Sequence, residues 1–133
     1  MANTVTTANN AQSVGTGSNV GSDKFPTKTT LTAGTTAAVI EARVVNGDGV
    51  RQDERQGLEI WWAVSTLSVA AAAAPALLRQ SAKKMSLVPG PAPLDDKAKM
   101  SDLFSCIGTY LYIWCEIPNM GVAAALSIYV VEP

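Results

Sequence analysis

Apolar and polar residues alternate most regularly near the carboxyl end of the chain. One alternating run covers Thr109–Ile117 and a second covers Ala123–Val131, with the turn formers Pro118-Asn119-Met120-Gly121 between them. A period of two is typical of β-strands that bury one face. The pattern therefore predicts a β-hairpin over this region. The side chains expected to face a core are Leu111, Ile113, Cys115, Ile117, Leu126, Ile128 and Val130.

Three further runs have the composition of strands. They cover Thr27–Thr32, Thr35–Val45 and Leu58–Leu67, and they are rich in β-branched and aromatic residues. Asn46-Gly47 follows the second run and is a strong hairpin signal, because both residues tolerate a positive φ. The chain is thus predicted to be mainly β, an antiparallel β-sandwich or small barrel with an extended N-terminal arm and one short helix.

The alanine-rich segment Ser68–Met85 is ambiguous. Its composition and Pro75 favour a short helix over Pro75–Lys84, although an extended conformation remains open. Ile60–Leu78 carry no charge, and this run of 19 residues is about as long as a membrane span. Pro75 and three hydroxyl residues interrupt that run, and its first half alternates like a strand. A small membrane protein of the holin type is therefore the less favoured alternative.

The first 22 residues have a different character. Met1–Ser22 contain no charged residue and consist mainly of Thr, Asn, Ala, Gly and Ser. The small apolar area of this segment cannot offset the conformational entropy that the segment loses when it becomes ordered. We therefore expect an extended arm over residues 1–24 that takes its shape from neighbouring subunits. Residues 25–133 would form the β-domain. The arm's candidate assembly contacts are its apolar residues and the first aromatic residue after it: Val5, Val14, Val20 and Phe25.

Composition argues against several functional classes. The chain has 133 residues, ten basic and eleven acidic side chains, and no histidine. A net charge of −1 disfavours direct nucleic-acid binding, which depends on neutralising phosphates. The absence of histidine removes the commonest general base and metal ligand. Cys106 and Cys115 are expected to be small buried hydrophobic residues. We therefore expect no enzymatic activity, no metal and no cofactor.

A stripe of aromatic residues is the most suggestive group in the sequence. Tyr110, Tyr112 and Trp114 share one face of their strand, and Trp61 is expected on the same face of the sheet. Such a face can belong to a core beneath the alanine-rich segment, form a subunit interface, or stack on sugar rings. The third reading makes a carbohydrate-binding β-sandwich module the alternative function.

As a whole, the chain resembles the capsid decoration and minor capsid proteins of tailed phages. The resemblance is carried by the small neutral β-domain, the uncharged N-terminal segment and the stiff loop Pro89–Pro93. It implies a structural virion protein that assembles in many copies through its N-terminal arm in the host cytoplasm. The implied partners are other copies of the chain and a major capsid protein, without contact to nucleic acid or membrane.

Overall fold

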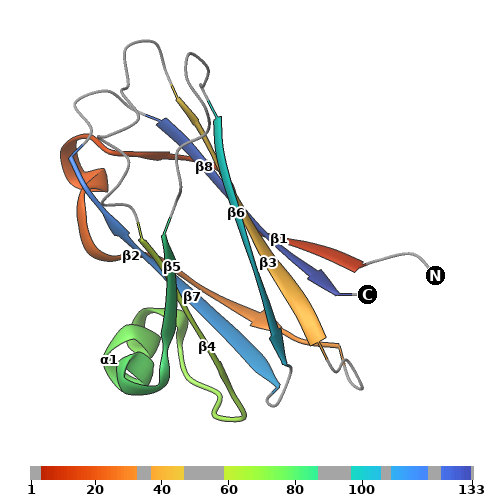
Figure 1. The fold of residues 1–133 in the computed structure, drawn as a ribbon. Helices are drawn as coiled ribbons and strands as arrows, with labels where there is room; N and C mark the ends of the chain where they lie inside the picture. Colours follow the sequence, from red (N-terminus) through yellow and green to blue (C-terminus); the bar gives the residue numbers. More distant parts are fainter. Residues whose placement is uncertain are drawn as a thin grey trace.

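The computed structural model describes residues 4–32, 37–46, 59–86, 97–105, 109–119 and 124–132. Most of these residues lie in antiparallel strands, which pack as two four-stranded sheets (Figure 1). The strands are β1 (Thr4–Val14), β2 (Gly21–Thr30), β3 (Ala37–Asn46), β4 (Glu59–Ser65), β5 (Lys83–Ser86), β6 (Lys97–Ser105), β7 (Tyr110–Ile117) and β8 (Ala124–Glu132).

The order of the strands is that of a jelly roll. One sheet has the order β1-β8-β3-β6 and the other has the order β2-β7-β4-β5. Successive strands therefore change sheet at almost every connection, as in the double Greek key of jelly rolls. The two sheets stay separate, so the expected β-sandwich is confirmed and the small barrel is not formed.

The main core lies between the two sheets and follows the predicted alternation. Each residue expected to face it from the last two strands is buried, with no more than 3% of its surface exposed. Ile60 and Trp62 of β4 join them, together with Ile40 of β3. Period-two alternation thus identified the inner faces of β7 and β8 correctly.

The predicted hairpins are wrong, although their strands exist. β7 pairs with β2 and β4, whereas β8 pairs with β1 and β3 in the opposite sheet. Likewise β3 and β4 lie in different sheets, and the turn expected after Asn46 falls outside the described residues. Alternation shows which side chains face inward but does not name the neighbouring strand. Two strands that face each other across a core have the same pattern as a hairpin.

The alanine-rich segment is partly helical and partly extended. The helix α1 covers Ala74–Leu78, with 3-10 turns on both sides, and Pro75 lies in its first turn, where its missing N–H costs nothing. The chain is a strand again from Lys83, so the predicted helix to Lys84 is too long. Across the described residues, no helix combines the length and apolarity that crossing a membrane requires.

The N-terminal residues lie within the sandwich. β1 pairs antiparallel with β8, and β2 pairs with β7, so the boundary expected at residue 24 falls inside β2. β1 and β2 are edge strands, and backbone hydrogen bonds to one neighbouring strand do much to hold them in place. They therefore need few apolar side chains, and the sequence pattern gives little sign of them. The segment expected to be an arm is therefore an edge strand followed by the start of a second one.

Candidate functional site

The predicted aromatic face exists on the outer side of the second sheet. Trp61 of β4 lies opposite Trp114 of β7, and their rings stack with centroids 6.4 Å apart and planes 12° apart. Tyr110 and Tyr112 follow along β7, with ring centroids 6.4 Å apart. The expectation that Trp61 shares a face with the β7 aromatics is thus confirmed.

The alanine-rich segment covers the middle of this face. Tyr112 and Trp114 are fully buried in a second hydrophobic cluster with Ala63, Ala74 and Leu78. The Tyr112 hydroxyl donates to the Leu67 carbonyl oxygen at 2.6 Å and accepts from the Val69 N–H at 3.0 Å. These bonds fasten the covering segment to the sheet. Tyr112 and Trp114 are therefore core residues and have no surface on which a sugar ring could stack.

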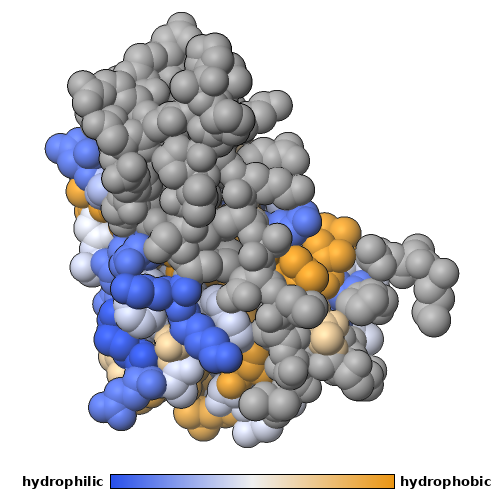
Figure 2. All heavy atoms as spheres, in the orientation of Figure 1, coloured by the Kyte–Doolittle hydropathy of each residue, from blue (hydrophilic) through white to orange (hydrophobic). Residues whose placement is uncertain are grey.

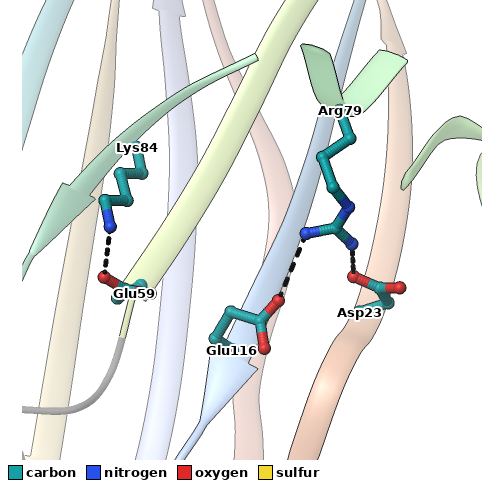
Figure 3. A network of polar contacts seen from close by, with 5 residues as sticks. All are labelled: Asp23, Glu59, Arg79, Lys84 and Glu116. Carbon is teal, nitrogen blue, oxygen red and sulfur yellow. Dashed lines mark hydrogen bonds and ion pairs between the residues drawn. The ribbon is translucent and has the colours of Figure 1, made fainter. Parts of the chain in front are cut away.

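Charged side chains surround the remaining exposed part of Trp61. The Arg79 guanidinium lies 5.3 Å from a Trp61 ring centroid, and the Lys84 Nζ lies 5.5 Å from it. Figure 3 shows that these cations are paired with carboxylates from three strands. Arg79 contacts Asp23 and lies 3.7 Å from Glu116, and Lys84 lies 3.0 Å from Glu59. Since each cation has an acidic partner, the ion pairs tie the 3-10 turn after α1 to β2 and β7, tie β5 to β4, and leave little net charge for a ligand.

The described residues offer little reactive chemistry. Burial, assisted by the charge of Glu116, raises the pKa of the Cys115 thiol to about 12. Such a thiol stays protonated and unreactive, as expected for a cysteine in a hydrophobic core. Cys106 lies outside the described residues. Among those that are described, no group of three or more His, Cys, Asp or Glu side chains could hold a metal ion.

The four residues predicted as assembly contacts have different environments. Val5 of β1 is 57% exposed, whereas Val14 at the end of the same strand is fully buried in the core. Val20 is half-buried, and Phe25 of β2 packs partly against the core cluster. Among these four, Val5 is therefore the one with a side chain open to a neighbouring molecule.

The edge formed by β1 differs from the other sheet edges. Its eleven residues contain no charge and no proline. The edge strand β2 contains both charges and a proline, and β5 begins with two lysines. The sequence of β6 likewise includes lysine and aspartate. Charges and prolines at edges prevent association between sheets, so β1 is the edge least protected against pairing with another chain.

A row of valines, which the sequence reading did not identify, continues from this edge across the outer face of the sheet. Val5 is the register partner of Val131 on β8, and Val131 is the partner of Val39 on β3. Val131 and Val39 are half-buried. Figure 2 shows hydrophobic surface on the side where Figure 1 has β1 and β8, close to both termini. Sequence spacing could not reveal this row, because its three members come from strands far apart in the chain.

The β1 edge is regular only at its beginning. The pairing with β8 keeps one register from Thr4 to Thr7, and then shifts between Thr7 and Asn9 and again between Asn9 and Gln12. Ala11, at the second shift, has a φ of 51°, which is unusual for a residue other than glycine. Such bulges bend an edge strand. The straight stretch available for pairing is therefore Thr4–Thr7.

Comparison with known proteins gives similarities of fold at low identity. No protein-family model matches the sequence, and no curated protein matches it either. One similar structure is the C-terminal CBM6 of the laminarinase LamC from Zobellia galactanivorans, with 10% identity, a TM-score of 0.46, and coverage of 97% of this chain and 98% of that one. Another is the carbohydrate-binding module CBM6cm-2 of Cellvibrio mixtus lichenase 5A, with 12% identity, a TM-score of 0.42, and coverage of 96% and 95%.

A viral capsid protein is also among the similar structures. It is VP2 of infectious bursal disease virus, determined as a subviral particle, with 11% identity and a TM-score of 0.41. The match covers 98% of this chain and 32% of the VP2 chain. The structural neighbours thus include both carbohydrate-binding modules and a viral capsid protein, and they do not distinguish between the two functions.

Proposed function

We propose that this chain is a structural virion protein, a capsid decoration or minor capsid component that assembles in many copies. Its partners would be other copies of itself and a major capsid protein, and the proposal includes no catalytic activity. The observation that carries it is the uncharged, open edge of β1, with Val5 exposed on it. An edge strand of this kind presents unpaired backbone N–H and C=O groups to another chain.

The topology of the sandwich is compatible with this role. Jelly rolls of two four-stranded sheets occur in viral capsid domains and also in lectins, so the fold by itself does not decide between them. Burial argues against the sugar platform predicted from the sequence, because Tyr112 and Trp114 lie beneath the alanine-rich segment. The distribution of charge favours β1 as the contact surface, because the three other edge strands carry charged residues and β1 carries none.

A contact through β1 would gain its strength from repetition. Backbone pairing over a few residues is weak in isolation, but many such contacts in one shell add to a stable assembly. The N-terminal segment keeps the role in assembly expected from its composition. The contact differs from the expected arm, because β1 pairs with β8 of its own chain along one edge and would contact another copy along its other edge.

The test compares two lysine substitutions on exposed strand residues. Val5→Lys places a charge on the β1 edge, and the matched control Thr30→Lys places one at the exposed end of β2. Sedimentation of the purified variants is expected to show the Thr30→Lys protein in the same assembly as the wild type and the Val5→Lys protein in much smaller species. Equal sedimentation of all three proteins would contradict the proposed contact.

Deletion of residues 1–22 is not a clean test. It would remove β1 completely and expose the backbone of β8, whose inner residues Leu126, Ile128 and Val130 are fully buried. Loss of assembly after such a deletion would then reflect damage to the fold. Point substitutions at exposed positions avoid this problem.

A further inference from the structure

We propose that the partner of β1 is β1 of a second copy, paired antiparallel about a two-fold axis at Val5. This inference rests on the proposed function and specifies the contact. The two β1-β8-β3-β6 sheets would then join into one continuous sheet. Two-fold dimers are the commonest symmetric oligomers, and their interface brings the same surface of both copies together.

The charge pattern makes the strand complementary to itself. When two copies of one strand pair antiparallel about a two-fold axis, each residue near the axis lies opposite, or close to, the same residue of the other copy. A charged residue there would therefore lie close to a like charge. β1 has no charge over Thr4–Val14 and incurs no such repulsion. The lysines that begin β5 would repel their copies in the same arrangement.

The exposed valine fixes the position of the axis. In antiparallel sheets the local two-fold axes are perpendicular to the sheet, so the outer face of one copy continues into the outer face of the other. With the axis at Val5, the two Val5 side chains lie opposite each other, and Thr4 of each copy lies opposite Thr6 of the other. This arrangement covers a side chain that is 57% exposed in the single chain.

The same axis unites the valine rows of the two copies. Val5, Val131 and Val39 lie in register on β1, β8 and β3. Pairing at Val5 would create an uninterrupted row of six valines across the joined sheet. Cross-strand pairs of β-branched residues stabilise sheets. The register shift that follows Thr7 limits the paired stretch, so the contact is short and depends on multiplicity within the assembly.

Cysteine substitution tests the geometry directly. Residues directly opposite in antiparallel strands have Cα atoms about 4.5–5.5 Å apart, within the range that a disulfide bridges. Val5→Cys is therefore expected to give a disulfide-linked dimer on mild oxidation. The matched control is Val131→Cys, on the same face but one strand farther from the axis. Its two copies would lie about 14 Å apart, three strand spacings, beyond disulfide reach.

The readout is a non-reducing gel of the assembled protein, with the oxidised wild type reporting any linkage through Cys106 or Cys115. We expect several-fold more dimer for Val5→Cys than for Val131→Cys or the wild type. Light scattering and circular dichroism of the same samples establish that each variant is folded and assembled. Equal and low linkage in assembled protein would overturn the self-pairing of β1, while the Val5→Lys result would still decide the proposed function.

Mixing the two cysteine variants excludes a different arrangement. If β1 instead exchanged between copies and paired with β8 of the neighbour, Val5→Cys of one chain would face Val131→Cys of the other. Co-refolded and oxidised mixtures would then contain dimers linked between the two variants. Such mixed dimers would overturn the two-fold contact at Val5, because two strand spacings separate these residues across the proposed axis. Protein that is monomeric and never links would overturn the contact between two copies, and failure to bind capsid particles as well would overturn the proposed function.

Discussion

Removing one hydroxyl group should measure how firmly the alanine-rich segment covers the aromatic cluster. The substitution is Tyr112→Phe, which keeps the fully buried ring and deletes the group that bonds to Leu67 and Val69. Each lost hydrogen bond contributes about 0.5–1.5 kcal/mol net, and the two backbone groups left behind lie in a segment partly open to water. We therefore expect the free energy of unfolding to fall by about 2 kcal/mol.

The assay is urea unfolding followed by tryptophan fluorescence, with thermal unfolding as a second measurement. For a domain of this size, a loss of 2 kcal/mol corresponds to a Tm lower by roughly 6–10 °C. The matched control is Tyr110→Phe, because no hydrogen bond of the Tyr110 hydroxyl is found within the described part of the chain. If both variants lose the same stability, or neither loses any, Tyr112 does not fasten this segment.

Three further predictions concern the core and the charged network. In a Cys106→Ser background, the Cys115 thiol should react with a thiol reagent only when the protein unfolds. Raising the pH from neutral to 9 accelerates the reaction of an exposed thiol, but it should not accelerate that of Cys115, because the pKa of this thiol is about 12. Ile128→Ala should lower the free energy of unfolding in urea by about 2–5 kcal/mol, whereas Val131→Ala on the outer face should lower it far less. Arg79→Ala should lower it by no more than about 1 kcal/mol, with a smaller effect at high salt, because the ion pairs to Asp23 and Glu116 are partly exposed. Rapid reaction of the thiol in folded protein, equal effects of the two alanine substitutions on β8, or a large salt-independent effect of Arg79→Ala would contradict these interpretations.

Side-chain alternation was sufficient to predict the faces of the central strands. In β7, every second residue from Leu111 to Ile117 is inward, and the aromatic residues between them are outward, as the sequence indicated. The pairing of strands could not be predicted in the same way. In a jelly roll, neighbours in the sheet are distant in sequence, and contact between such strands leaves no periodic signal.

The candidate site was predictable in part. Composition singled out the uncharged N-terminal segment and Val5 within it. It could not show that the segment pairs with β8, because edge strands depend on backbone hydrogen bonds that any sequence without proline can make. Nor could it place Val131 and Val39 beside Val5, since their register follows from the complete sheet. The burial of Tyr112 was likewise decided by the alanine-rich segment that packs on it.

If the chain is a building block of a larger particle, the mass of the purified wild-type protein in solution will show it. Light scattering over a range of concentrations, with electron microscopy of the same sample, would give that mass against the 13.9 kDa of a single chain. We expect assemblies of many copies, alone or on addition of the capsid to which the protein belongs. A protein that stays a 13.9 kDa monomer at every concentration and does not bind such particles would contradict it.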